Sequence, residues 1–142
     1  MTFKLDKDSS IVDFHIKLND SNRSNNYESV QLIWGRDSFR NSKSIDYENR
    51  YTSLAYGFEE KKDSYLSVGG STNKNINSVN WISFREHFFS SILILKNQVN
   101  DVFISSEDLA GNETLDNKFT KRFLANVCLL YTSDAADDGR CV

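Results

Sequence analysis

Apolar and polar residues alternate with a period of two along much of the chain. Between Ile11 and Leu18 the apolar residues share one side of an extended backbone, and Asp13 and His15 lie on the other. Successive side chains of a strand point to opposite faces, so this segment is predicted to be a half-buried strand with His15 outside the core. The same pattern predicts strands at Val30–Trp34, Arg50–Phe58, Tyr65–Val68, Val79–Phe84, Phe88–Leu95 and Val102–Ser105.

The segments between these strands are rich in Asn, Ser, Asp and Gly. Such residues favour turns because of their backbone geometry and local hydrogen bonding. The predicted loops are Asn19–Asn26, Arg36–Ser44, Glu59–Ser64, Gly69–Ser78 and Lys96–Asp101. Many short strands at this spacing predict an all-β, mainly antiparallel sandwich.

The segment Phe88–Leu95 departs from simple alternation because it is almost continuously apolar. Runs of this kind are typical of strands covered on both faces. We therefore expect packing roles, not a ligand platform, for the aromatic residues around it. The residues predicted to include several of the most buried side chains are Trp81, Phe84, Phe89, Ile92 and Ile94.

The last fifteen residues, Cys128–Val142, differ in composition from the rest of the chain. They read CLLYTSDAADDGRCV. Translation of the DNA sequence TGT-CTC-TTA-TAC-ACA-TCT-GAC-GCT-GCC-GAC gives the first ten of these residues, and that DNA resembles a transposase-type sequencing adapter. Residues 128–142 are therefore interpreted as a non-native, adapter-derived tail. We expect this tail to make few tertiary contacts and no native Cys128–Cys141 disulfide, although Leu129, Leu130 and Tyr131 are apolar enough to continue a strand.

Size and charge limit the classes of protein to which the chain can belong. Its 142 residues, 39% of them hydrophobic, are enough for one domain or part of one. The net charge of −3, with Lys and Arg scattered along the sequence, argues against nucleic acid as a partner. No apolar run approaches the roughly 20 residues that a membrane-spanning helix needs.

Candidate catalytic groups are few. His15 and His87 have no Cys, His or carboxylate at metal-ligand spacing, so structural or solvent-facing roles are expected for both. Arg85-Glu86 is interpreted as a charged turn between two strands. No catalytic, cofactor-binding or metal-binding residue is predicted, and no cofactor is expected.

Two segments resemble a known family: Tyr47–Tyr56, and Val79–Ile94 with Trp81, Phe88 and Phe89 at matching positions. They are similar to the large periplasmic domain of bacterial YidC/Oxa-type membrane protein insertases. The resemblance implies that residues 1–127 are part of that domain. It also implies an incomplete β-supersandwich similar to galactose mutarotases, in which Trp81, Phe88 and Phe89 have packing roles.

The function implied by the resemblance is not enzymatic. The family assists insertion and folding of inner-membrane proteins, alone or with the Sec translocon, so the implied partners are nascent membrane proteins and Sec components. The implied location is the periplasmic side of the bacterial inner membrane, held there by transmembrane helices outside this sequence. The alternative is a secreted carbohydrate-binding or mutarotase-like sandwich with exposed aromatics such as Tyr47, Tyr51 and Tyr56. Its enzymatic form requires a His and a carboxylate in one cleft.

Overall fold

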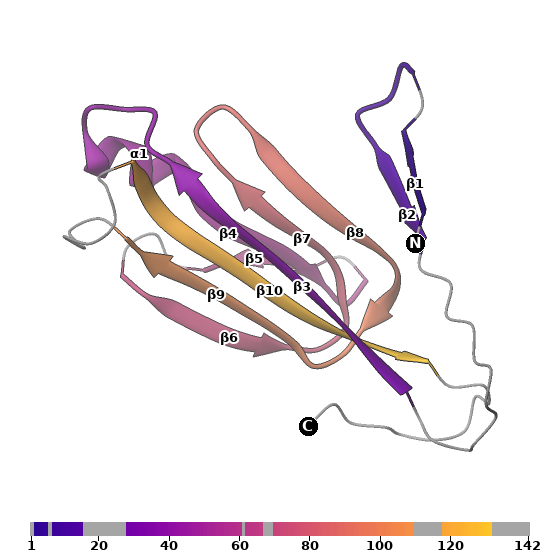
Figure 1. Ribbon diagram of the computed structural model, residues 1–142. Coiled ribbons are helices and arrows are strands. Elements are labelled where there is room, and N and C mark those ends of the chain that lie inside the picture. The colour runs from indigo at the N-terminus through magenta and orange to yellow at the C-terminus, as the bar shows by residue number, and fades with distance from the viewer. Residues whose placement is uncertain are drawn as a thin grey trace.

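The computed structural model describes residues 2–5, 7–15, 28–60, 62–66, 70–109 and 118–131. In this part of the chain ten strands and one short helix are present (Figure 1). Their bounds are β1 (Thr2–Leu5), β2 (Val12–His15), β3 (Glu28–Phe39), α1 (Ile45–Tyr51), β4 (Ser53–Phe58), β5 (Lys62–Tyr65), β6 (Thr72–Ile76), β7 (Val79–Arg85), β8 (Ser90–Val99), β9 (Val102–Asp108) and β10 (Phe119–Tyr131).

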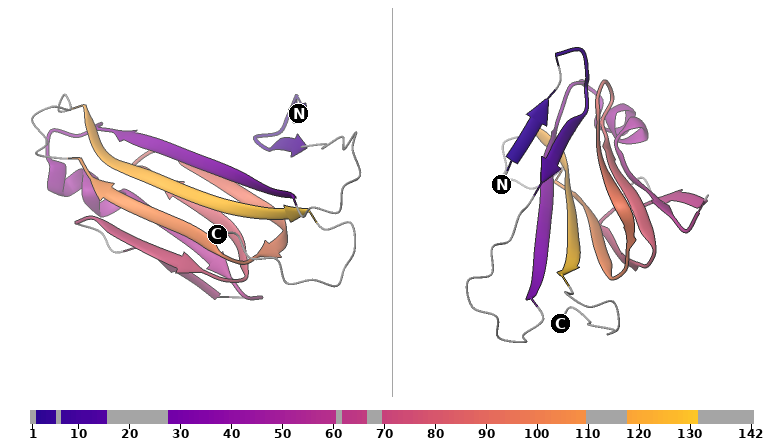
Figure 2. Two further views of the ribbon diagram at one scale, coloured as in Figure 1. Left: turned by 60° about the horizontal axis from the view of Figure 1, so that its bottom comes forward. Right: turned by 90° about the vertical axis from the view of Figure 1, so that its right-hand side faces the viewer.

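Eight of the strands form two four-stranded antiparallel sheets that pack face to face (Figure 2). The first sheet has the order β3-β10-β9-β6 and the second the order β5-β4-β7-β8. Side chains of β3 contact β7 and β8, and Lys74 of β6 donates a hydrogen bond to Tyr56 of β4. The edge strands β3 and β8 therefore lie on one side of the sandwich, and β6 and β5 on the other. The predicted all-β, mainly antiparallel architecture is confirmed.

The core lies between the two sheets, where alternate residues of each strand point inward. Burial of such side chains is the main force holding two sheets together. Fully or nearly fully buried residues come from both sheets: Leu54, Tyr56, Val79, Ile82, Phe84, Val102, Ile104, Phe123, Ala125 and Val127.

An aromatic stack joins the sheets near the middle of this core. Phe84 of β7 stacks on Trp34 of β3 with ring centroids 4.0 Å apart, and on Phe123 of β10 at 5.4 Å. Trp34 and Phe123 belong to the first sheet and Phe84 to the second, so the three rings span the interface. Stacked aromatic pairs stabilise a fold beyond the area they bury, so this stack strengthens the contact between the sheets.

The remaining strands, β1 and β2, form a separate hairpin that stands apart from the sandwich in Figures 1 and 2. The predicted alternation is confirmed for Val12–His15, and His15 is exposed as expected. Phe3 stacks on Phe14 across the hairpin at 5.0 Å. The prediction of a half-buried strand is wrong, however, because Val12 and the apolar residues of β1 are more than half exposed.

Several strands lie where the sequence predicted loops. β5 and β6 are polar, with sequences KDSY and TNKNI, so no apolar period marked them. They are edge strands, where charged and polar side chains are common. β3 and β8 also extend into predicted loops, to Phe39 and Val99. Conversely, the strands predicted at Val79–Phe84 and Val102–Ser105 are present within β7 and β9.

The predicted burial of β8 is wrong. Phe89, Ile92 and Ile94 are 70%, 58% and 69% exposed. β8 is the last strand of its sheet and is covered on one face only, so Leu93 and Leu95 point to the core while Ile92 and Ile94 point outward. Of the five residues predicted to be most buried, only Phe84 is fully buried.

The residues that match the family resemblance also differ from their expected packing role. Phe88 is 67% exposed and lies with Phe89 in the turn before β8. Trp81 is partly exposed on the outer face of β7, with its indole over Gly57 of the neighbouring strand β4. A Cβ at position 57 would collide with that indole, so Gly57 is required for Trp81 to lie flat on the sheet.

The beginning of the proposed tail is part of the fold. Cys128–Tyr131 continue β10 and pair with Glu28–Gln31 of β3, and Leu129 packs against the core. The expectation of few contacts is therefore wrong for these four residues. Cys128 is disulfide-bonded, contrary to the expectation of no disulfide. Residues 132–142 lie outside the described residues.

We predict that Phe84→Ala lowers the free energy of unfolding by about 3–5 kcal/mol, because it removes the central ring of the stack and leaves a cavity. Phe89→Ala is the matched control and should cost less than about 1 kcal/mol, since surface substitutions have small effects. Urea denaturation followed by far-UV circular dichroism measures both. Equal losses for the two variants would contradict the assignment of the core.

Candidate interaction surface

The short helix α1 lies at one end of the sandwich, directly before β4 (Figure 1). Ser44 caps it, because its hydroxyl accepts a hydrogen bond from the Tyr47 amide at 3.3 Å. Acidic residues in the first turn and Arg50 in the last complement the helix dipole. The cap and the charged residues are visible in the sequence. The helix was missed because the segment before it was predicted as the loop Arg36–Ser44 and its last residues as part of the strand Arg50–Phe58.

A tight turn connects β7 to β8 at the same end of the molecule. The Glu86 amide donates a hydrogen bond to the Phe89 carbonyl at 2.7 Å, so the turn spans Glu86–Phe89. The turn was predicted at Arg85-Glu86, but Arg85 is the last residue of β7. The turn places His87 between the helix and Phe88. Ring centroids lie 4.8 Å apart for Tyr51 and His87, 5.3 Å for Tyr47 and His87, and 4.3 Å for His87 and Phe88.

These four residues, Tyr47, Tyr51, His87 and Phe88, are called the aromatic cluster below. Tyr47 and Tyr51 are 46% and 47% exposed, so the cluster is open to solvent although its rings contact one another. The exposure predicted for Tyr47 and Tyr51 is thus confirmed. The exposure predicted for Tyr56 is wrong, since that side chain is buried on the inner face of β4.

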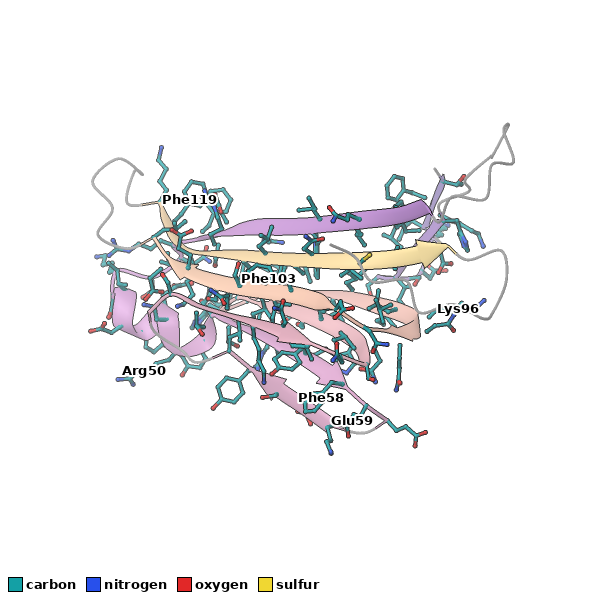
Figure 3. All side chains as sticks on the ribbon, turned by 90° about the horizontal axis from the view of Figure 1, so that it is seen from below. Arg50, Phe58, Glu59, Lys96, Phe103 and Phe119 are labelled. Atoms are coloured by element: carbon teal, nitrogen blue, oxygen red, sulfur yellow. The ribbon has the colours of Figure 1, made fainter. Side chains whose placement is uncertain are left out.

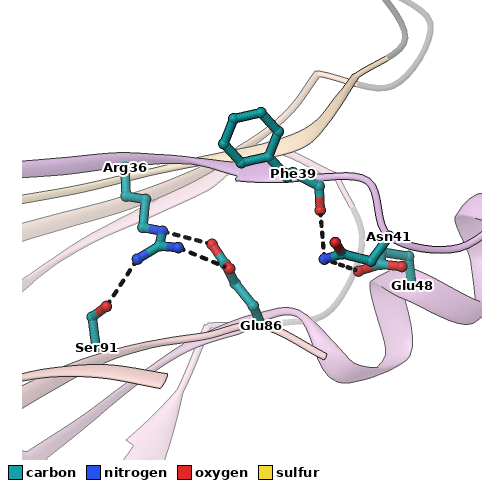
Figure 4. A network of polar contacts seen from close by, with 6 residues as sticks. All are labelled: Arg36, Phe39, Asn41, Glu48, Glu86 and Ser91. Atoms are coloured by element: carbon teal, nitrogen blue, oxygen red, sulfur yellow. Dashed lines mark hydrogen bonds and ion pairs between the residues drawn. The ribbon is translucent and has the colours of Figure 1, made fainter. Parts of the chain in front are cut away.

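A polar network holds the turn of the cluster against the other sheet (Figure 4). The Arg36 guanidinium of β3 binds the Glu86 carboxylate through two contacts, of 2.7 Å from Nε to Oε1 and 3.1 Å from Nη2 to Oε2. Its Nη1 donates a hydrogen bond to Ser91 Oγ at 3.0 Å. Glu86 is almost completely buried, so Arg36 provides the charge that this carboxylate needs in a poorly solvated position.

A second buried carboxylate belongs to a residue of α1 itself. Glu48 is fully buried, and its Oε1 is 3.5 Å from the amide nitrogen of Asn41, which also donates to the Phe39 carbonyl (Figure 4). The Glu48 carbonyl accepts a hydrogen bond from Thr52 Oγ1 at 2.9 Å. These contacts tie the helix to the end of β3 and fix the direction in which Tyr47 and Tyr51 project.

Within the residues that the structure describes, neither histidine has a hydrogen bond or ion pair to a carboxylate of the kind that the mutarotase-like alternative requires. His15 lies on the separate hairpin, and His87 lies among aromatic rings. Glu86, next to His87 in the sequence, directs its carboxylate to Arg36. Among the described residues no three His, Cys, Asp or Glu side chains are placed to hold a metal ion, and no helix is long and apolar enough to cross a membrane.

The outer face of the first sheet has a different electrostatic feature. Arg122 of β10 donates hydrogen bonds of 2.8 and 3.0 Å to the two carboxylate oxygens of Asp37, its cross-strand neighbour on β3. These bonds hold the pKa of Asp37 below its ordinary value of 3.8, although partial burial opposes the shift. The same pair raises the pKa of Arg122.

The fold and surface together define a class: an antiparallel β-sandwich that presents exposed aromatic and apolar side chains at one end. Comparison with known proteins shows which sequences this chain is similar to. The chain is similar to the membrane protein insertase YidC of Phocaeicola vulgatus, with 29% identity over 110 residues, or 73% of this chain and 17% of that protein.

Two further relatives carry the same name. The Parabacteroides distasonis protein is 29% identical over 87 residues and the Porphyromonas gingivalis protein 28% identical over 89 residues; each match covers 61% of this chain and 14% of the relative. The chain thus spans less than a fifth of the length of the relatives it matches. No protein-family model and no solved structure matches it. The resemblance to YidC-type insertases is confirmed, and the more specific likeness to galactose mutarotases stays a prediction.

We predict that Arg36→Met lowers the free energy of unfolding by about 2–3 kcal/mol, because it leaves the Glu86 carboxylate buried without its partner. The double variant Arg36→Met/Glu86→Gln removes the stranded charge and should recover part of the loss. Chemical denaturation of the single and double variants gives the coupling energy. A loss below about 0.5 kcal/mol for Arg36→Met would show that the network does not hold the turn.

A pH prediction follows from Asp37. A carboxyl whose pKa is lowered in the folded state stabilises the fold above its ordinary pKa of 3.8, and this contribution is lost as the pH falls through the lowered value. Asp37→Asn should therefore reduce the fall in melting temperature between about pH 5 and about pH 2. Asp63→Asn, which changes an exposed carboxylate of β5, is the control. Identical acid profiles for Asp37→Asn and the unmodified chain would contradict the prediction.

Proposed function

We propose that this chain is part of the periplasmic domain of a YidC-type insertase of the bacterial inner membrane. In this role it supports insertion and folding of nascent membrane proteins, with or without the Sec translocon. The observation that carries the proposal is the similarity of 61–73% of the chain to a segment of proteins named membrane protein insertase YidC. The role is not enzymatic, and the transport step belongs to the membrane-embedded part of such a protein.

The geometry supports a contact or positioning role. The cluster at the α1 end has exposed rings on a rigid support, since the Arg36–Glu86 pair and the capped helix fix both of its segments. Rigid exposed aromatics are a common feature of protein interaction surfaces. The two carboxylates nearest to it, Glu48 and Glu86, are buried and engaged in structural contacts, which makes them poor candidates for acid–base chemistry.

We also propose that residues 1–127 represent the native sequence and residues 128–142 an adapter-derived tail. The codon correspondence and the distinct composition of the tail support this. The strand position of Cys128–Tyr131 is compatible with it, because three of these four residues are apolar and would extend β10 in place of native residues.

Sequencing the genomic locus tests both parts of the proposal. We expect the native reading frame to depart from the present sequence directly after Val127 and then to encode further strands followed by several apolar runs of about 20 residues, each long enough to span a bilayer. A stop codon close after Val127, with no such runs, would contradict the insertase assignment. A native frame that encodes CLLYTSDAAD would contradict the adapter assignment alone.

A domain exchange tests the function. The matched segment of the Phocaeicola vulgatus insertase is replaced by the corresponding residues of this chain, and the chimera is expressed while the host insertase is depleted. We expect the chimera to restore growth and insertion of a membrane reporter protein, and the same chimera with Phe84→Ala to lose this ability through loss of the fold. A chimera that accumulates in the membrane but does not restore insertion would contradict the proposal.

A further inference from the structure

The β7–β8 side of the second sheet has an unusual distribution of charge. Between Val79 and Val99 the only acidic residue is Glu86, which is buried and paired with Arg36. The same segment has two exposed basic residues, Arg85 at the end of β7 and Lys96 on β8. In a chain of net charge −3, the sequence of β7 and β8 is thus locally basic.

Apolar side chains occupy the space between these charges. Ile92 and Ile94 point outward from β8, and Trp81 lies beside Ile94 in the register of β7 and β8. Lys96 follows at the next outward position, because alternate residues of a strand share a face. Contiguous exposed apolar surface of this kind marks an interaction site in a folded protein.

The aromatic cluster continues this surface at the α1 end. Phe88 and Phe89 are exposed in the turn before β8, and two serines separate them from the exposed Ile92. Arg50 lies on α1, which also carries Tyr47 and Tyr51. Figure 3 shows Arg50 at one end of the sandwich and Lys96 at the other. The surface defined by Tyr47, Tyr51, Phe88, Ile92, Ile94 and their basic neighbours therefore extends along the sandwich; it is called the basic-aromatic face.

We propose that the basic-aromatic face binds the surface of an anionic phospholipid bilayer. Tyr rings with an apolar body and a polar tip are suited to the boundary between headgroups and acyl chains, and Phe and Ile side chains gain free energy by entering it. Arg50, Arg85 and Lys96 are complementary to the negative headgroups, and each basic residue near such a surface adds to binding. The proposal rests on this surface alone and not on the insertase assignment.

A polypeptide partner fits the observations less well. Extended peptides are bound by strand addition or in a groove, whereas this surface is formed by a helix, a turn and the outward side chains of strands. A lipid surface requires exposed apolar side chains with cationic groups beside them, which Arg50, Arg85 and Lys96 provide; α1 also carries the exposed carboxylate of Asp46. A lipid partner also explains why β7 and β8 have no acidic residue, and why the one carboxylate of the turn between them, that of Glu86, is buried and paired.

Flotation of the 142-residue chain with lipid vesicles tests the proposal. We expect binding to vesicles of phosphatidylglycerol and phosphatidylcholine, little binding to vesicles of phosphatidylcholine alone, and release at high ionic strength, where screening is strong. Equal binding to both vesicle types, or no binding to either, would overturn the proposal.

Matched variants identify the surface responsible. Arg50→Gln/Arg85→Gln should weaken binding to the anionic vesicles by about tenfold or more, since two basic groups near the lipid are removed. Lys4→Gln/Lys7→Gln makes the same change in net charge on the separate hairpin and should leave binding nearly unchanged. Equal losses for the two pairs would overturn the proposal, because binding would then depend on net charge alone.

The apolar part of the face has its own test. Phe88→Ser/Ile94→Ser should also weaken binding at constant charge, while far-UV circular dichroism and melting temperature show that the sandwich is retained. Undiminished binding by this folded variant would overturn the role of the apolar side chains. A different result would assign the face to a protein partner. In that case the unmodified chain would bind vesicles equally at every phosphatidylglycerol content, and a soluble acidic peptide would compete with the vesicles for binding.

Discussion

The contact between Phe84 and the rings of Trp34 and Phe123 is the interaction on which the rest of the structure depends. Each sheet buries one apolar face, and neither is stable with that face exposed to water. The three stacked rings set the position of β7 relative to β3 and β10. Arg36 lies two residues beyond Trp34 on the same face of β3, and Glu86 two residues beyond Phe84, so the stack also brings this ion pair together.

The interaction surface is a consequence of that alignment. Because Arg36 binds Glu86 and Ser91, both ends of the β7–β8 turn are anchored to the opposite sheet. Unlike Glu86, the residues at the tip of the turn do not point into the sandwich. His87 packs against Tyr51 of α1, and Phe88 packs against His87. Burial of the Glu86 carboxylate and exposure of the Phe88 ring are thus two results of the same short turn.

Much of the fold could be predicted from the sequence, because inward and outward residues alternate in β9 and over most of β4, and the apolar residues of β7 mark it as a strand. Burial in β8 could not, since a run such as Ile92–Leu95 has the same appearance in a central strand and in an edge strand. The neighbours of a strand are set by long-range pairing, which local sequence does not contain. Part of the surface was visible as the exposed residues Tyr47 and Tyr51, but their proximity to His87 arises only from the tertiary structure.

The four edges of the two sheets are not equivalent. On one side, β5 and β6 are short and carry Lys62, Asp63 and Lys74, features that discourage further backbone pairing. On the other side, β3 and β8 are 12 and 10 residues long, and β8 has no charged residue before Lys96. Unsatisfied amide and carbonyl groups at such edges act as templates for another strand. In the described part of the molecule, short and charged edge strands therefore disfavour further strand pairing along one flank, and longer edge strands favour it along the other.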